Sequence, residues 1–129
     1  MSSMRTAMVI PALCLALVCQ GKPLHADADL LRTFAVCAGR LSAQMEFQWL
    51  MADPAADRTE AQREAVVELL ASILPPDRGR EVLGWRVNAK AAHAALLSRA
   101  AFSPDAEEAG WAARQAEALT AECAGLLLS

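Results

Sequence analysis

Two cysteines, Cys37 and Cys123, are the residues of this sequence best placed for covalent chemistry. Cys14 and Cys19 lie in an N-terminal segment that we expect to be removed, which leaves an even pair. This pair has no C-x-x-C spacing and no neighbouring histidine, which disfavours redox exchange and metal binding. Free or intermolecular thiols are a further alternative. In an oxidising compartment an even pair usually forms a structural disulfide, so we predict a Cys37–Cys123 bond.

His93 is the one histidine that would remain in the mature chain, because His25 lies at the predicted cut. A zinc site usually takes several Cys or His ligands, and covalent haem attachment requires C-x-x-C-H, which the sequence lacks. A non-covalent haem in a helical bundle can use one Met and one His, and Met45 with His93 is the candidate pair. Met45 also suits a core position, where methionine is a common filler. A small haem- or metal-binding bundle is therefore the alternative function.

Glu60, Glu64 and Glu68 form an acidic row at a spacing of four residues. Carboxylate metal sites in helical bundles need Glu-x-x-His, which this row lacks. We interpret the row as a solvated helix face opposite Arg86 and Lys90. The sequence also has no G-x-S-x-G motif and no Gly-rich loop before a helix. We therefore predict a protein without enzymatic activity and expect no cofactor.

Tryptophans supply the only indication of a binding surface. Trp49 and Trp85 fit core or core-edge positions, whereas Trp111 falls off the inward stripe of its predicted helix. An exposed tryptophan is often an interface anchor, although a shift of one residue in helix phase would bury Trp111 instead. The apolar segment 48–51 is also wider than one helix stripe needs. We predict that Trp111 and Trp49 belong to a surface that binds another protein.

The N-terminus has the order of a secretory signal peptide. Arg5 gives a positive start, residues 7–19 are an uncharged apolar run, and small residues stand at Ala26 and Ala28. The run is shorter than the roughly 20 residues needed to cross a bilayer, so we expect no stable membrane anchor. Cleavage after either alanine fits, and we favour Ala26. The predicted organisation is a signal peptide over residues 1–26 and one domain over residues 27–129.

Removal of residues 1–26 makes the chain more acidic. Arg5 and Lys22 leave, and the full sequence has 12 basic and 15 acidic residues, so the net charge changes from −3 to −5. A moderately acidic domain has no general attraction to nucleic acid or anionic lipid. Arginine greatly outnumbers lysine, which is typical of a GC-rich genome. Together these features predict a periplasmic or secreted bacterial protein, an accessory or interaction factor whose partner is another exported protein.

The elements that must position these residues are four helices. Abundant alanine and few aromatic residues favour close-packed helices over strands. Proline-containing breaks at 53–56, 75–76 and 102–104 separate predicted helices at about 29–51, 58–74, 76–101 and 104–127. The predicted caps are Asp57 for the second helix and Ser103 for the fourth, with Pro104 as its first residue. The predicted inward stripes are Leu30, Phe34, Cys37, Leu41, Met45 and Gln48 or Trp49; Ala61 or Ala65, Val66, Leu69 and Ile73; Val82, Trp85, Ala89, Ala92 and Leu96; and Ala109, Ala113 or Ala112, Ala116, Leu119 and Cys123.

The cysteine positions agree with an up-down-up-down bundle. In that topology the end of the fourth helix lies beside the start of the first. Cys37 would lie about 12 Å along the first helix and Cys123 about 6 Å from the end of the fourth, at 1.5 Å per residue. We therefore predict that a disulfide joins the first and last helices. Closing so long a loop would stabilise the fold by about 4–5 kcal/mol in the chain-entropy model.

Overall fold

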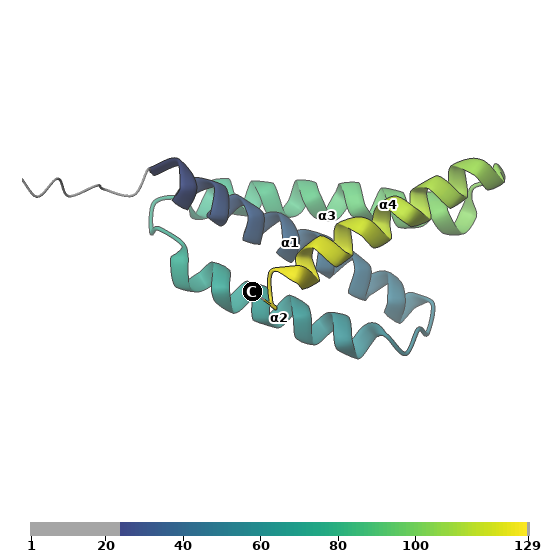
Figure 1. Cartoon of the computed structure of the whole chain (residues 1–129), viewed down its shortest axis with the longest axis horizontal. Helices are drawn as coiled ribbons and strands as arrows, with labels where there is room; N and C mark the ends of the chain where they lie inside the picture. Colours follow the sequence, from purple (N-terminus) through teal and green to yellow (C-terminus); the bar gives the residue numbers. More distant parts are fainter. Residues whose placement is uncertain (1–23, 129) are drawn as a thin grey trace, which may run out of the picture.

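A computed structural model describes residues 24–128 of the chain. Four helices follow one another: α1 (Leu24–Leu50), α2 (Ala56–Ile73), α3 (Gly79–Phe102) and α4 (Ala106–Gly125). Consecutive helices run antiparallel, which confirms the predicted all-α, up-down-up-down bundle (Figure 1). Most of the predicted signal peptide lies outside the described residues, so its cleavage stays a prediction. Within the described part of the chain, no helix has the length and apolar character that a membrane span requires.

Helix α1 is the core of the bundle rather than one of four equivalent helices. It packs against α2, α3 and α4, as Figure 1 shows. The side chains that α1 buries therefore surround much of the helix instead of forming one stripe. They are Leu31, Phe34, Ala35, Cys37, Ala38, Leu41, Ser42, Ala43, Met45 and Gln48. From Asp27 onward, where the structure describes side-chain burial, the first buried side chain is Leu31, so cleavage after Ala26 or Ala28 would leave these buried residues in place.

Gly39 allows α1 and α3 to approach each other closely. A Cβ atom at this position would collide with the backbone carbonyl oxygen of Arg86 and lie 3.0 Å from the backbone nitrogen of Lys90. Ala35 and Ala43, one turn away on either side, are also buried. Small residues thus replace large ones along this contact, which explains how a chain with few aromatic residues fills its interior.

The predicted inward stripes are wrong by one residue at several positions. Leu30 is exposed and Leu31 is buried. Three helices cover α1, so its buried side chains do not follow the single stripe that was predicted through Leu30. On α2, Leu69 and Ile73 are exposed, whereas Leu70 faces α1 together with the correctly predicted Val66. Leu69, Leu70 and Ile73 are similarly apolar, so the sequence alone does not decide between neighbouring phases.

Helices α3 and α4 show the same kind of shift. On α3, His93 and Leu97 are buried where the prediction placed Ala92 and Leu96, while Val82 is buried as predicted. On α4, the alternative of Ala112 is correct, and Ala116 and Cys123 are buried as predicted. Alanines occupy both the covered and the solvent-facing sides of these helices, so hydrophobicity varies little around them.

Two predicted helix caps are wrong. Asp105, not Ser103, caps α4: its Oδ1 accepts hydrogen bonds from the backbone N–H groups of Glu107 at 2.9 Å and Glu108 at 3.1 Å. Ser103 lies two residues earlier, where its Oγ accepts a hydrogen bond from the Asp105 N–H at 3.3 Å. Asp57 is not a cap either, because α2 begins at Ala56 and Ala55 precedes it. In both cases a neighbouring residue of the proline-containing turn defines the start of the helix.

Candidate functional site

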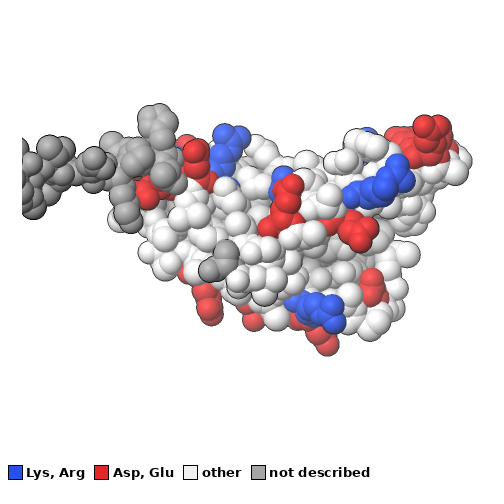
Figure 2. Space-filling model, in the orientation of Figure 1, with Lys and Arg blue, Asp and Glu red and all other residues white. Residues whose placement is uncertain are grey.

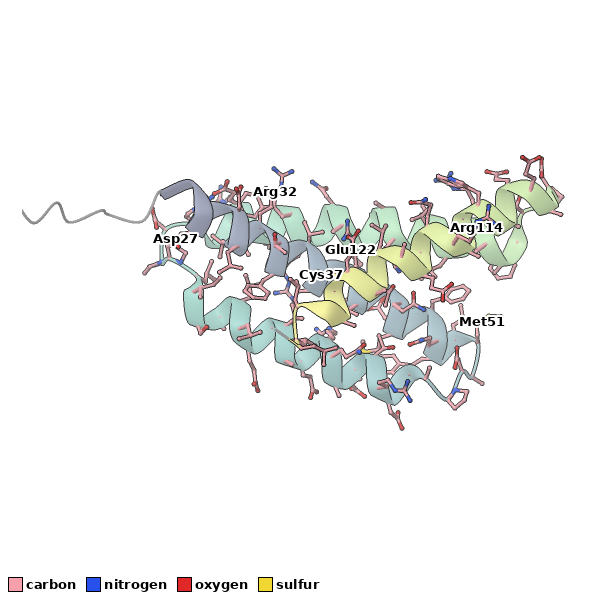
Figure 3. All side chains as sticks on the ribbon, in the orientation of Figure 1. Asp27, Arg32, Cys37, Met51, Arg114 and Glu122 are labelled. Carbon is pink, nitrogen blue, oxygen red and sulfur yellow. A yellow bond between two sulfur atoms is a disulfide. The ribbon has the colours of Figure 1, made fainter. Side chains whose placement is uncertain are left out.

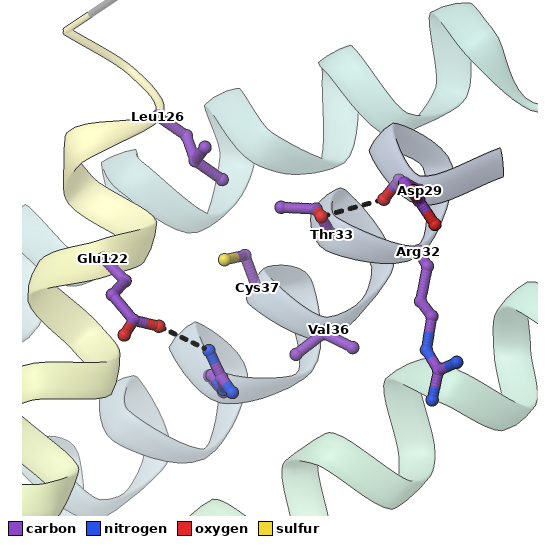
Figure 4. Close-up of a pocket in the computed structure, with 8 residues that line it drawn as sticks. Asp29, Arg32, Thr33, Val36, Cys37, Glu122 and Leu126 are labelled. Atoms are coloured by element: carbon purple, nitrogen blue, oxygen red, sulfur yellow. Dashed lines mark hydrogen bonds and ion pairs between the residues drawn. The ribbon is translucent and has the colours of Figure 1, made fainter. Parts of the chain in front are cut away.

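The disulfide between Cys37 and Cys123 confirms the predicted link between the first and last helices. The two Cα atoms are 5.4 Å apart, and both residues are buried. Beside the bond, Arg40 Nη1 on α1 lies 3.4 Å from Glu122 Oε2 on α4, the pair that the dashed line at Glu122 marks in Figure 4. The bond uses both sulfurs, so neither is a thiolate nucleophile or a metal ligand in this state. A buried disulfide indicates an oxidising compartment outside the cytoplasm.

His93 is the most buried ionisable side chain of the bundle, with 1% of its surface exposed. Its Nε2 lies 3.0 Å from Gln44 Oε1 on α1 and 3.4 Å from Thr120 Oγ1 on α4. The Thr120 hydroxyl donates to the carbonyl oxygen of Ala116 at 2.8 Å, so both neighbouring oxygens can accept from an Nε2–H. Burial, helped by the positive charge of Arg40, lowers the His93 pKa to about 4. The imidazole is therefore neutral at neutral pH.

The geometry gives no support to the Met45–His93 haem alternative. The Nε2 of His93 is already engaged by Gln44 and Thr120. The cavity that His93 lines lies between α1, α3 and α4, and Met45 is not among the residues around it. Met45 is buried, as expected of a core filler. A visible absorption spectrum of the native protein would decide the question directly.

The carboxylates do not gather into a ligand set. Among the described residues, no group of three or more His, Cys, Asp or Glu side chains is placed to hold a metal ion. Glu64 and Glu68 of the acidic row are exposed, and Glu60 is partly exposed. The predicted cationic neighbour Lys90 instead pairs with α1, where its Nζ lies 2.6 Å from Glu46 Oε1.

A groove of about 410 Å³ runs between α2 and α4, floored by α1 and α3. Alanine is the commonest residue of its walls, and three glutamines contribute amide groups: Gln44 and Gln48 from α1 and Gln62 from α2. Gln48 is 8% exposed, and its Oε1 has no hydrogen-bond partner among the described residues. A buried acceptor without a donor costs free energy, so a ligand N–H or O–H at this point would be favourable. We call this feature the alanine groove; the sequence did not reveal it.

Apolar side chains are exposed at one end of the bundle, where α1 and α3 finish. Figure 3 shows Met51 at this end, opposite the end that carries Asp27. Trp49, Leu50 and Met51 are 51%, 77% and 51% exposed, and Phe102 is 66% exposed. We call these four residues the turn-end surface. The alternative in which Gln48 rather than Trp49 faces the core is thus the correct one.

Trp111 lies on α4 near the same end and is 46% exposed. Its phase was therefore not off by one: the ring faces outward, and the guanidinium of Arg99 lies 6.0 Å from the ring centroid. The Arg99 contact covers part of Trp111 from the α3 side, whereas Trp49 stands at the turn between α1 and α2. The structure brings both predicted surface residues to one end of the bundle, and sequence reasoning missed Phe102, the exposed last residue of α3 at the same end.

Comparison with known proteins adds no relative: no family model, no curated protein and no solved structure matches this chain.

Proposed function

We propose that this protein is a non-enzymatic accessory or interaction protein of the bacterial periplasm that binds another exported protein through its turn-end surface. One observation carries the proposal: three consecutive apolar residues, Trp49, Leu50 and Met51, are each more than half exposed. Burying a large apolar side chain completely is worth about 1.5–3 kcal/mol. A partner that covered these three side chains and Phe102 would therefore gain substantial free energy.

The alanine groove supports the same proposal, because it begins at this end of the bundle. Gln48 lies in the last turns of α1 and Ala100 lies near the end of α3. Apolar side chains from a partner segment could enter the groove while a donor group satisfies Gln48 Oε1. Insertion of the apolar face of a helix into such a groove is a common mode of recognition. Figure 2 shows charged side chains of both signs in small groups, some of them at the end where α3 meets α4, so the apolar contact would have a charged rim.

The disulfide and the sequence of the N-terminus support the proposed location in the periplasm. Mass spectrometry of the protein recovered from its native host should find an N-terminus at Asp27 or Asp29 and Cys37 and Cys123 joined. A retained Met1 or two free thiols would contradict export to the periplasm.

Site-specific photocrosslinking in the native host tests the partner surface. A benzoylphenylalanine at Leu50 or Phe102 should yield one discrete adduct, whereas the same group at Glu64, exposed on α2, should not. The adduct should disappear in a Trp49→Ala background, because the anchor is lost while the core is untouched. Equal adducts from Leu50 and Glu64, or an adduct insensitive to Trp49→Ala, would contradict the proposed surface.

A further inference from the structure

A second groove, of about 270 Å³, lies on a different side of the molecule, between α1, α3 and Leu119 of α4. Arg32, Val36 and Arg40 line it from α1 at a spacing of four residues, so the two arginines stand about 12 Å apart along the helix axis. None of the ten side chains around this groove is acidic, although the sequence has an acidic net charge. We call it the arginine groove.

The two arginines present their charge differently. Arg32 is exposed at the mouth, where its guanidinium lies 5.6 Å from the ring centroid of Trp85. Figure 4 shows its side chain directed away from Glu122. Arg40 is more enclosed, with 23% of its side chain exposed, and it pairs with Glu122 through Nη1 alone, at 3.4 Å. A guanidinium has five donors, so Arg40 keeps several for another acceptor.

The nearby carboxylates do not enter the arginine groove. Glu122 meets Arg40 from the adjacent depression between α1 and α4, which Asp29 also lines. Glu81 pairs with Arg78 on α3, with Nε 2.8 Å from Oε2, and its charge also interacts with Arg32. These carboxylates reduce the positive charge around the arginine groove without occupying its interior.

His93 forms part of the boundary of the arginine groove. It lines the arginine groove, whereas Gln44 and Thr120, which contact its Nε2, line the alanine groove. The ring therefore separates the two grooves. Nδ1 is buried and has no hydrogen-bond partner among the described residues; with the proton on Nε2 it is an acceptor, so a carboxylate does not pair with it and the anion is held by the arginines alone. The remainder of the floor is apolar and includes Val36, Ala89 and Ala92.

From this geometry we propose that the arginine groove binds a small carboxylate with an apolar body. Arg40 receives the carboxylate through charge-assisted hydrogen bonds, and Arg32 adds positive charge at the mouth. The apolar body lies over Val36, Ala89 and Ala92 toward Trp85. A volume of about 270 Å³ corresponds to roughly nine water molecules at about 30 Å³ each, which is comparable to one aromatic ring with a short chain. This site is separate from the turn-end surface.

Titration of the purified, oxidised protein with 3-phenylpropionate, followed by NMR, tests this proposal. The indole N–H of Trp85 and the Nε–H of Arg40 should shift and saturate in the millimolar range or below. The uncharged isostere 3-phenylpropionamide should bind at least about tenfold more weakly, because it lacks the charge that Arg40 recognises. Equal binding of the two compounds, or no saturable shift, would overturn the proposal.

Variants of opposite expected sign make the test specific. Arg40→Gln should weaken binding at least about tenfold, whereas Glu122→Gln should strengthen it about two- to fivefold by freeing Arg40. Ala92→Leu, at an exposed position in the floor, should block the groove without disturbing the core. Arg58→Gln on α2 is the matched control and should change nothing. Circular dichroism checks that each variant is folded; Arg40→Gln binding like the wild type, or Glu122→Gln failing to tighten it, would refute the assignment.

Discussion

Replacing Gly39 with alanine tests how closely α1 and α3 pack. In a helix interior, glycine is less favourable than alanine by about 1 kcal/mol, so Gly→Ala normally stabilises a helix where space allows. At Gly39 there is no space, because the added Cβ would collide with the carbonyl oxygen of Arg86 and lie 3.1 Å from Ala89 Cβ. Gly84, within α3, has nothing within 4 Å of the same hypothetical atom. The two glycines therefore form a matched pair.

The magnitude follows from the atoms that must move. A backbone carbonyl cannot rotate away as a flexible side chain can, so α1 and α3 must separate along their buried contact. Overpacking of this kind costs about 1–3 kcal/mol, and the backbone obstruction favours the upper end. With the propensity gain of about 1 kcal/mol, Gly39→Ala should lower the free energy of unfolding by about 2 kcal/mol. Gly84→Ala should raise it by up to about 1 kcal/mol.

Urea denaturation of the oxidised mature domain, followed by far-ultraviolet circular dichroism, measures both changes. Because the two variants share the same gain in helix propensity, the difference between them isolates the packing cost. A difference near zero, or a Gly39→Ala protein more stable than the wild type, would refute the close approach of α1 and α3.

Three further predictions concern the disulfide, His93 and the turn after α1. The Cys37–Cys123 bond closes a loop of 86 residues, so replacing both cysteines with serine should lower the free energy of unfolding by about 4–5 kcal/mol. Calorimetry should show a melting temperature lower by about 20 °C. A decrease in stability under about 1 kcal/mol would contradict the chain-entropy argument. Burial holds the pKa of His93 at about 4, below the ordinary value of about 6.5, so the unfolded chain takes up a proton first as the pH falls. The free energy of unfolding should therefore drop by up to about 3 kcal/mol between about pH 6.5 and 4. Urea midpoints measured across this range should show a weaker drop in His93→Gln. Ala52 has φ of 54°, in the left-handed region at a helix C-terminus where glycine is preferred, so Ala52→Gly should raise the free energy of unfolding by about 0.5–1 kcal/mol; a loss of stability in thermal melts would show that the strain is absent.

The ends of the helices were predictable because local chemistry fixes them. Proline removes a backbone donor and clashes with the preceding turn, whatever the tertiary context. The predicted breaks at 53–56, 75–76 and 102–104 therefore lie close to the observed ends of α1 at Leu50, α2 at Ile73 and α3 at Phe102. The disulfide was predictable because removal of the predicted signal peptide would leave two cysteines, which have one intramolecular pairing.

The faces of the helices were harder to predict, because they depend on how many neighbours each helix has. Leu30 and Leu31 are equally hydrophobic, and only the three-sided burial of α1 decides that Leu31 is covered. Gln48 is buried beside an exposed Trp49, which reverses the order that hydrophobicity favours. A polar residue inside and a tryptophan outside form a combination that stability alone does not explain, and it occurs next to the alanine groove.

Neither groove could be predicted from spacing along the chain, since each combines residues from three or more helices. The sequence singles out His93 as a lone histidine, but it does not predict the partners Gln44 on α1 and Thr120 on α4, which lie 49 and 27 residues away. Arg32 and Arg40 carried no motif. They become notable only because α3 places Trp85 and His93 opposite them.

The arrangement of the bundle links its stability to its grooves. Small residues on α1 bring α3 close, while α4 rests mainly on α3 and on the α1 residues around Cys37. Few large side chains hold α4 in place, so the covalent bond from Cys37 to Cys123 is a main attachment of α4 to α1. Cys123 directly precedes Ala124, which lines the alanine groove, and Cys37 lies three residues before Arg40, which lines the arginine groove. The disulfide that compensates for a core of small side chains therefore also holds α1 and α4 together. Both of these helices line the alanine groove and the arginine groove, where we place the partner segment and the carboxylate.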